Sequence, residues 1–509
     1  MKQLLSKKIG LVFIIIQFLL TVGLIGLILY VDILPEKYLL VIAILLVFLL
    51  AYTFFSQMAK KMYIVGRVLS GIFCVIIIVG AAYLWRGYQA INNMSDVDIK
   101  VDEVSAIVLA EDPAQSVDDA VDYEFGILKE IGREYTDAML NNLETELGKK
   151  LLTREYEDAV SLVDALYNKE IKVIIFNEAY REMITELHEN FETETRVLGN
   201  HQIETVVEIT EEEDKVDETS DLKKPFIMYC SGIDTYGKIS KTSRSDVNIV
   251  AVVNPETAQI LLINTPRDYY VPLSISNGKG DKLTHAGIYG VDVSVETLEM
   301  LYDIDIDYYA RVNFSGLTDI VDALGGVKVY SDFTFTSDWG PSFKEGYNEV
   351  NGKQALAFCR ERHHLGSGDL QRGKNHQYMI TAIIDKVTSP AILKNFNKLM
   401  DSVEGAFETN MKTKKITRFV KMQMDENPKW NIESLSAGGT GGKTYTYSMP
   451  SQRSYVMYPD ENSISEIKDA IKTILDGKKL KKDKEDGKDK DSDNGKDKNE
   501  SSQTKKSGD

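Results

Sequence analysis

The N-terminal part of the chain contains three long apolar runs, Ile9–Val31, Tyr38–Phe55 and Val68–Trp85. Each run has close to the ~20 residues that an α-helix needs to cross a bilayer. The first run is longer than the core of a signal peptide, and no small-residue cleavage pattern follows it. We therefore predict that residues 1–91 form a three-span membrane anchor.

Basic residues gather before the first run (Lys2, Lys7, Lys8) and between the second and third runs (Lys60, Lys61, Arg67). Loops rich in Lys and Arg stay on the cytoplasmic side of a membrane. This pattern predicts a multi-pass protein of the cell membrane with a cytoplasmic N-terminus, and it places everything after Trp85 outside the cell. A two-span protein, with the third run as an amphipathic or core helix, is the alternative and would leave the bulk of the chain in the cytosol.

The 509 residues allow two or three domains, and 59 Lys and Arg against 77 Asp and Glu give a formal net charge of -18. That balance argues against nucleic acid as a partner, because such binding needs a broad basic surface. Three cysteines are present, Cys74, Cys230 and Cys359, without the close spacing of a metal site. We favour buried free thiols, and a Cys230–Cys359 disulfide stays open.

Beyond the membrane part, the pattern divides the chain into an accessory α/β domain (98–212), a larger α/β domain (225–476) and a tail (477–509). In the accessory domain, Val104–Ala110 and Ile171–Phe176 read as strands with helical patterns between them, and Arg196–Ile209 reads as an extended segment or hairpin. We expect this domain to be a spacer or a partner-docking module. The larger domain alternates strands with helices, which predicts a sheet covered on both faces. The tail is rich in Lys, Asp, Gly and Ser, so we expect it to be disordered.

Two short apolar runs, Val247–Val253 and Ile260–Ile263, flank the turn signal Asn254-Pro255 and predict a hairpin. Charged residues lie just outside both runs: Arg244, Asp246, Arg267 and Asp268. The hairpin would bring these two arginines and two carboxylates to one edge of an apolar core, where unpaired charge is costly. A pair of structural salt bridges is the alternative to a functional site.

Further polar residues come from other segments. The strand Phe226–Cys230 is followed by Asp234, and Arg360 and Arg362 would share one face if their segment is extended. The expected helix Leu370–Val387 begins near Arg372, and a helix N-terminus favours phosphate; Asp369 and Gln377 lie close by in the sequence. Arginine suits phosphate oxygens, and paired carboxylates beside a diphosphate suit Mg²⁺. The set predicts a site for a pyrophosphate ester.

Seven segments of this region resemble the signature blocks of the LytR-CpsA-Psr family, in the family's order. They are Arg244-Ser245-Asp246, Thr265-Pro266-Arg267-Asp268, Arg311-Val312-Asn313-Phe314, Val321-Asp322-Ala323-Leu324-Gly325-Gly326-Val327, Asn351-Gly352-Lys353-Gln354-Ala355-Leu356, Arg360-Glu361-Arg362 and Gly368-Asp369-Leu370-Gln371-Arg372. The three spans and the accessory domain resemble the capsule-type CpsA branch of streptococci.

The resemblance implies an α-β-α sandwich with a central mixed sheet and an apolar pocket for a prenyl tail. It implies a membrane-bound extracellular phosphotransferase that moves a capsular or wall glycan from undecaprenyl diphosphate to peptidoglycan, has pyrophosphatase activity and has other capsule-assembly proteins as partners. It also implies Mg²⁺, or Mn²⁺, as cofactor. The implied roles are catalysis for Arg267 and Asp268, metal binding for Asp234 and Asp246, and phosphate or lipid binding for Arg244, Arg360, Arg362, Arg372 and Gln377.

The chain departs from the family at one place. Many members carry Arg-Gln-Gln where this chain has Asn375-His376-Gln377, so the implied phosphate clamp lacks one guanidinium. His376 is a substitute donor or a helix-capping residue, and the sequence leaves both readings open.

Three other functions compete with this one. A non-catalytic membrane regulator that binds lipid-linked phosphate would use the same arginines but would not need two carboxylates for metal. A DNA-binding attenuator conflicts with the predicted export and the negative charge, and hydrolysis without transfer differs only in the acceptor. The pair His363-His364 lacks a third zinc ligand at suitable spacing, so we expect a solvated loop there.

Overall fold

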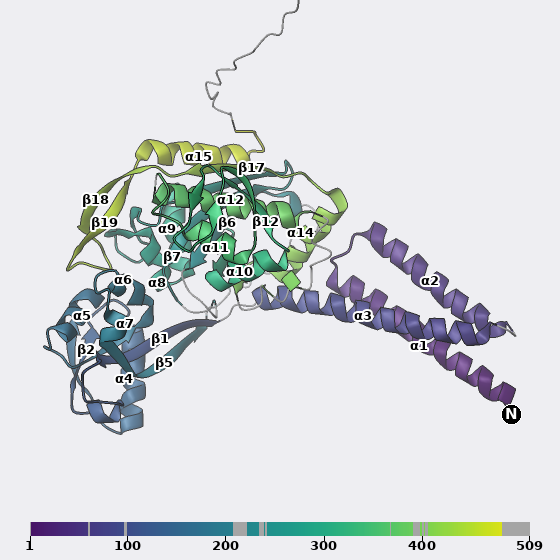
Figure 1. The fold of residues 1–509 in the computed structure, drawn as a ribbon, viewed down its shortest axis with the longest axis horizontal. Coiled ribbons are helices and arrows are strands. Elements are labelled where there is room, and N and C mark those ends of the chain that lie inside the picture. The colour runs from purple at the N-terminus through teal and green to yellow at the C-terminus, as the bar shows by residue number, and fades with distance from the viewer. Residues whose placement is uncertain are drawn as a thin grey trace, which may run out of the picture.

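The computed structural model describes residues 2–59, 62–95, 99–206, 221–233, 239, 242–366, 368–389, 398–399, 402 and 406–480. The predicted metal ligand Asp234 and most of the charged tail lie outside this part of the chain. The described residues form a bundle of long helices, an accessory domain and a larger C-terminal domain (Figure 1).

The helix bundle consists of α1 (Lys2–Val31), α2 (Glu36–Met58) and α3 (Tyr63–Ser95). All three helices are long and apolar enough to cross a membrane, and many of their large apolar side chains are exposed. The three predicted spans are therefore confirmed as apolar helices, and α3 extends beyond its predicted run at both ends. In Figure 1 the bundle projects from the C-terminal domain on the side opposite the accessory domain.

The ends of the bundle contact the C-terminal domain through α14 (Thr413–Glu426). Lys421 Nζ lies 2.6 Å from Asp32 Oδ1, and Val31 and Ile91 are buried in an apolar cluster that also contains residues of the C-terminal domain. Because both polar and apolar contacts join them, the domain is held directly against the ends of the membrane helices.

The accessory domain is a five-stranded sheet with the order β3-β2-β4-β1-β5. Its strands are β1 (Ile99–Leu109), β2 (Glu124–Leu128), β3 (Leu152–Tyr156), β4 (Val173–Asn177) and β5 (Thr195–Val206). One face packs on α4 (Arg133–Leu147), and the other packs on α5 (Ala159–Tyr167) and α6 (Arg181–Thr185). The strands β2 and β3 lie where the sequence predicted only helices. Of the two interpretations of 196–209, the extended segment is confirmed for the described residues and the hairpin is wrong, because β5 continues through Gly199 with a shift of register in its pairing with β1.

The C-terminal domain is built on a six-stranded sheet with the order β16-β11-β6-β7-β8-β17. Its strands are β6 (Phe226–Ile233), β7 (Ser245–Asn254), β8 (Gln259–Asn264), β11 (Tyr308–Asn313), β16 (Phe407–Thr409) and β17 (Asn431–Ser436). The sheet is mixed: β11 with β6 and β17 with β8 are parallel pairs, and the other pairs are antiparallel. The predicted hairpin is the pair β7–β8 at its centre.

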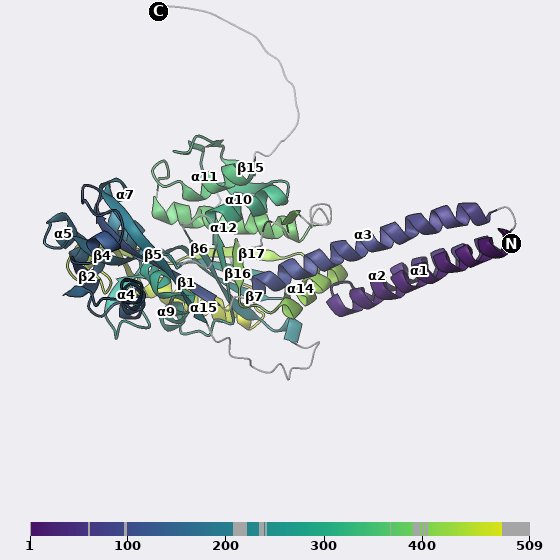
Figure 2. The ribbon, with the colours of Figure 1, turned by 90° about the horizontal axis from the view of Figure 1, so that it is seen from below.

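Helices cover both faces of this sheet (Figure 2). On one side lie α8 (Leu283–Tyr289), α9 (Val291–Tyr302) and α15 (Glu461–Leu475), and on the other α10 (Phe314–Ala323), α11 (Gly352–Arg360) and α12 (Asp369–Val387). Successive strand residues point to opposite faces. Val250 and Val252 accordingly pack with the first group, while Ile249 and Ala251 pack toward α12. The predicted α-β-α sandwich with a mixed sheet is confirmed.

Four two-stranded ribbons complete the domain. They are β9 (Tyr270–Pro272) with β10 (Gly280–Lys282), β12 (Val327–Ser331) with β15 (Gly346–Val350), β13 (Phe335–Thr336) with β14 (Ser342–Phe343), and β18 (Gly439–Tyr445) with β19 (Arg453–Pro459). The turn between β13 and β14 lies beside the end of α11, where Glu361 accepts a hydrogen bond from the backbone of Asp338.

The accessory domain packs on the C-terminal domain. Ile288 of α8 and Met449 belong to the same apolar cluster as Leu162 and Phe176 of the accessory domain. The Asp158 carboxylate, which caps α5, also accepts a hydrogen bond of 3.0 Å from the Ser451 backbone. Because the two domains share an apolar cluster, the accessory domain packs directly against α8 and is not joined to the C-terminal domain by a linker alone.

The contact of α8 with the start of β7 gives a first prediction. A Cβ atom on Gly287 would lie 2.6 Å from Ser243 O and 2.7 Å from Ser245 N, so Gly287→Ala must push the backbone that carries Arg244. We expect a loss of stability of about 1–3 kcal/mol, measured by chemical denaturation of the solubilised protein. Gly366→Ala is the matched control, since nothing lies within 4 Å of its Cβ position. Equal stability of the two variants would contradict this account of the packing.

Candidate functional site

A cavity of about 620 Å³ lies between the central sheet and α12. Its walls are apolar, with Ala251, Val253, Ile260 and Leu262 from β7 and β8, and Met379, Ile380, Ile383 and Ile384 from α12. Phe314, Leu317 and Ile320 of α10 and Leu356 of α11 close it further. The interior therefore offers a hydrocarbon chain a largely apolar environment.

Charged side chains gather where the cavity meets the ends of the strands. Six arginines line it: Arg244, Arg267, Arg311, Arg360, Arg362 and Arg372. Five of them are residues that the sequence predicted for catalysis or phosphate binding. Arg311 was not predicted, although it lies in one of the recognised blocks; it comes from β11 and makes an ion pair of 3.2 Å with Glu408.

Asp246 and Arg267 form the central pair of this site. Arg267 Nη1 donates to both Asp246 oxygens, at 3.0 and 2.9 Å, and Thr284 Oγ1 donates to Oδ1. Burial by itself would raise the pKa of Asp246, but Arg267, Arg244 and Arg372 together hold it well below its usual range. Asp246 is therefore a permanent carboxylate.

Arg267 is itself nearly buried, with 10% of its side chain exposed. Burial opposes its charge, yet Asp246 and Asp268 raise its pKa above the ordinary value. Within the described part of the chain, its Nε has no hydrogen-bond partner. A buried guanidinium nitrogen without a partner is costly and is ready to bind an anion.

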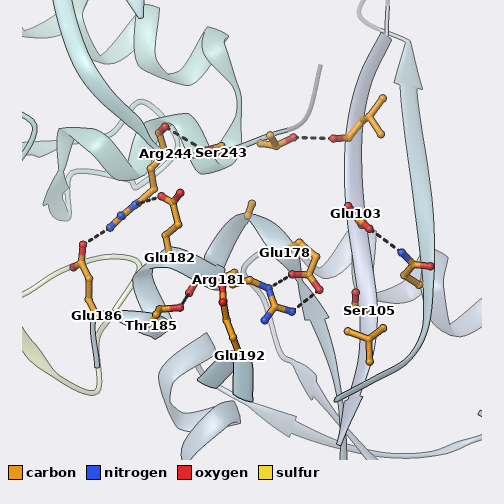
Figure 3. A pocket seen from close by; sticks show the side chains of 15 residues that line it. Glu103, Ser105, Glu178, Arg181, Glu182, Thr185, Glu186, Glu192, Ser243 and Arg244 are labelled. Carbon is orange, nitrogen blue, oxygen red and sulfur yellow. Dashed lines mark hydrogen bonds and ion pairs between the residues drawn. The ribbon is translucent and has the colours of Figure 1, made fainter. Parts of the chain in front are cut away.

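Arg244 faces the accessory domain. Its Nε donates to Glu182 at 3.1 Å and its Nη1 to Glu186 at 2.7 Å (Figure 3). Glu186 also lies 3.9 Å from Arg267 Nη2 and lines the cavity. Sequence reasoning missed both glutamates. They belong to α6 and its C-terminal end, and the sequence of this helix gives no sign that it packs beside arginines of another domain.

Arg360 and Arg362 reach the cavity differently from the prediction. Their segment is not a strand: α11 ends at Arg360, and Glu361 after it has an extended backbone. The Arg360 guanidinium lies over the rings of Phe314 and Trp339, at 4.5 and 4.7 Å from their centres. Glu361 is fully buried and accepts hydrogen bonds from the backbone of Arg362 and His364. The helix end and this carboxylate hold the two arginines at the entrance.

Arg372 and His376 lie one turn apart on α12. Burial lowers the pKa of Arg372, with the ion pair to Asp369 at 2.6 Å opposing that effect. His376 lines the cavity, and its Nε2 lies 2.9 Å from the carbonyl oxygen of Cys359. Burial and the charge of Arg372 lower the pKa of His376 to about 3. It is therefore a neutral imidazole that donates from Nε2 to a carbonyl in the last turn of α11, so it is a donor that caps the end of that neighbouring helix.

Two predicted site residues are not among those that line the cavity in the described chain. Gln377 turns to the sheet, where Nε2 donates to the carbonyl oxygens of Leu262 and Leu435, at 2.9 and 2.6 Å. Asp268 pairs with Lys282 at 3.2 Å and lies 3.9 Å from Arg267 Nε. Gln377 thus joins β8 to β17. Asp268 lies beside the Arg267 guanidinium and stabilises its positive charge.

The residues present fit the predicted metal in part. Asp246 supplies a buried, ionised carboxylate at the cavity entrance, which is the oxygen ligand that Mg²⁺ prefers. Its predicted partner Asp234 lies outside the described residues, so the pair stays a prediction.

A different group of ligand atoms does converge in the described chain. One oxygen each of Asp338 and Glu361 and a ring nitrogen of His364 lie within 4.8 Å of one another. The sequence showed no third ligand near His363-His364 because Asp338 comes from the distant turn between β13 and β14. His363 is exposed, as expected, and its Nδ1 lies 2.8 Å from Asp338. All three cysteines, which are in the described part of the chain, are free.

The sequence model of the LytR-CpsA-Psr family matches residues 195–473, which is more than half of the chain. The chain belongs to the LytR-CpsA-Psr family. The match covers the whole C-terminal sandwich with its arginine-lined cavity, together with β5 of the accessory domain.

Relatives of known name fall in the same family. The chain is similar to the polyisoprenyl-teichoic acid–peptidoglycan teichoic acid transferase TagU of Enterococcus faecalis, with 31% identity over 261 residues, 50% of this chain and 82% of that protein. TagU of Bacillus subtilis is 31% identical over 50% of this chain and 79% of that protein. Among solved structures, B. subtilis TagU (31% identity, TM-score 0.40, 51% and 99% covered) and TagT bound to LI-WTA (26%, 0.41, 52% and 95%) are similar.

The buried state of His376 generates a prediction about pH. In the unfolded chain its pKa is near 6.5, whereas in the folded protein it is about 3. The unfolded state therefore binds a proton first as pH falls, and stability is lost from pH 6.5 downward at about 1.4 kcal/mol per pH unit. His376→Gln can keep the donor to Cys359 and should lack this component. Denaturation at pH 7 and pH 5 measures it; the same loss in both proteins would contradict the assignment.

Proposed function

We propose that this protein transfers a capsular or wall glycan from an undecaprenyl-diphosphate carrier to peptidoglycan at the outer face of the membrane, and that it also hydrolyses the diphosphate. The family places the chain among proteins that include named glycopolymer transferases. The finer assignment of substrate rests on the cavity.

One observation carries the proposal: an apolar cavity of about 620 Å³ has six arginines among the residues that line it. A ligand that matches both parts must join a long apolar chain to a multiply charged anion. Burying hydrocarbon contributes about 0.8 kcal/mol per CH₂ group, and arginine binds phosphate oxygens through paired N–H donors. A polyprenyl diphosphate has both parts.

The position of the cavity agrees with a ligand that comes from a bilayer. Ile320 and Phe407 line the cavity and also pack in the cluster that contains Val31 and Ile91 from the ends of the membrane helices. A prenyl chain would leave the lipid phase close to the cavity wall. The positive loops predict that this side of the membrane is the extracellular one.

Each residue at the entrance would have a distinct part in the transfer. Arg360, Arg362 and Arg372 would bind the diphosphate oxygens, and Arg244 would join them. The unpartnered Nε of Arg267 would stabilise the negative charge that develops at the phosphorus. The acceptor hydroxyl then forms its bond to phosphorus as the bond to the prenyl phosphate breaks, and its proton leaves to a nearby carboxylate or to water.

Mg²⁺ belongs to this proposal. Asp246, with Asp234 as the predicted second ligand, would hold it, and the ion would neutralise charge on the diphosphate. With a cation bound, Asp246 would share its negative charge between that ion and Arg267.

Replacing Arg267 tests the catalytic assignment. Arg267→Ala should lower phosphate release from a polyprenyl diphosphate with Mg²⁺ by about 100-fold or more, because one stabilising donor is commonly worth that much. Arg133→Ala is the matched control, since Arg133 makes ion pairs in the accessory domain only. Full turnover by Arg267→Ala would remove it from catalysis. Tight lipid binding by the wild type without turnover, even with acceptor, would favour a regulator.

Narrowing the cavity tests the lipid assignment. Ala310 of β11 lines it and pairs with Cys230 on β6, so Ala310→Phe would fill space that a long chain needs. The KM for a long-chain prenyl diphosphate should rise about tenfold, while a short-chain prenyl diphosphate should be turned over as by the wild type. The short substrate reports folding of the same variant, and equal effects on both substrates would contradict the assignment.

A further inference from the structure

A second cavity, of about 750 Å³, lies between the accessory domain and the loop that precedes β7 (Figure 3). Its walls come from β1, β5 and α6 of the accessory domain and from residues 242–244 of the C-terminal domain. We call this cavity the interdomain groove. Nothing in the proposed phosphate chemistry uses its accessory-domain wall.

The groove is richer in polar side chains than the cavity beneath α12. Five glutamates line it, Glu103, Glu178, Glu182, Glu186 and Glu192, together with two arginines, hydroxyl groups and the amide of Asn200. Val101, Ala179 and Val197 add apolar side chains, and the hydrocarbon parts of the longer side chains add further apolar surface. Carboxylates accept hydrogen bonds and repel anions. The lining therefore suits an uncharged ligand with many hydroxyl and amide donors.

The groove and the apolar cavity meet at two residues. Arg244 and Glu186 line both of them, and a hydrogen bond of 2.7 Å joins these two side chains where the two spaces meet. Burial would raise the pKa of Glu186, but Arg244, Arg267 and Lys282 keep it below the usual range, so the carboxylate is charged. A ligand in the groove would have one end beside the arginines that meet the diphosphate.

We propose that the interdomain groove binds the neutral glycan backbone of the acceptor, peptidoglycan, and presents its hydroxyl to the diphosphate across Glu186. This inference rests on the proposed function. A transferase of this kind needs two sites that touch: an apolar one with a cationic end for the lipid-linked donor, and a hydrophilic one for the acceptor. Within the described part of the chain, the cavity beneath α12 and the interdomain groove have these two characters, and the accessory domain supplies most of the groove.

The charge of the groove decides between the two sugar chains that could enter it. Five glutamates against two arginines repel a polymer that carries phosphates or other acidic groups. The sugar chain of peptidoglycan carries no phosphate, and its lactyl carboxyl groups are bound in amides to the peptides, so the sugar chain itself is uncharged and meets no such repulsion. Binding of the donor's own glycan is the opposing outcome of the test.

A bulky side chain in the groove tests the proposal without any turnover. Val197 is 43% exposed on β5 and lines the groove, so Val197→Trp should obstruct it. Leu152→Trp is the matched control, because Leu152 is 66% exposed on β3 and is not among the groove residues. Asn200→Trp is a second obstructing variant at an exposed position, for the case that the first does not fold.

Calorimetry of the full-length solubilised protein with oligomers of N-acetylglucosamine, which are neutral chains of the same acetylated sugar type, gives the first readout. We expect the obstructing variants to bind about tenfold more weakly than the wild type and Leu152→Trp. Equal affinity in all four proteins, or no binding to the wild type, would overturn the inference. Weaker binding of the lipid-linked donor glycan instead would show that the groove holds the donor.

Phosphate release separates this inference from the proposed function. With polyprenyl diphosphate alone, the obstructing variants should match the wild type, because Val197 and Asn200 do not line the apolar cavity in the described chain. With acceptor added, only their KM for acceptor should rise. No release by the wild type would defeat the proposed function, whereas normal release with an unchanged KM for acceptor would defeat the groove alone.

Discussion

Positive charge buried at the end of a sheet is the constraint on which this structure depends. Arg244, Arg267 and Arg372 are nearly buried, and each would be expensive without an anion nearby. Asp246 compensates the centre of the group, and Glu182 and Glu186 compensate Arg244 from the accessory domain. The exposed Arg362 and the ring-stacked Arg360 complete the group at the surface. A diphosphate would supply the negative charge that the protein provides only in part.

That charge also explains why the domains are arranged as they are. The apolar cavity needs a cationic end for an amphiphile, and it lies beside the cluster that contacts the membrane helices. The groove needs the accessory domain, whose glutamates would otherwise be a cluster of like charges with little compensation. Arg244 therefore has two positions of interest: it is bonded to two glutamates of the accessory domain, and it lines both the apolar cavity and the interdomain groove.

Local patterns in the sequence predicted the parts of the fold that depend on neighbours in the chain. The hairpin β7–β8, with Asp246 and Arg267 at one edge, follows from two β-branched runs around a turn, and α12 follows from its periodicity. Arg360 and Arg362 were expected to share one face if their segment is extended, whereas the capping box at Asn351 begins a helix that ends at Arg360. Gln377 matched a family block, but its amide is taken by two backbone carbonyls. Glu186 and Asp338 were missed because only tertiary packing brings them to the site.

The central claim is that one cavity takes the prenyl chain while the arginines take its diphosphate. Photo-crosslinking the full-length protein in lipid bilayers with a polyprenyl diphosphate that carries a diazirine on the chain tests it most directly, with the modified peptides read by mass spectrometry. The account predicts adducts on β7, β8 and α12, at residues such as Leu262 and Ile380, and competition by unlabelled polyprenyl diphosphate. Adducts confined to the membrane helices, or unaffected by the competitor, would contradict it.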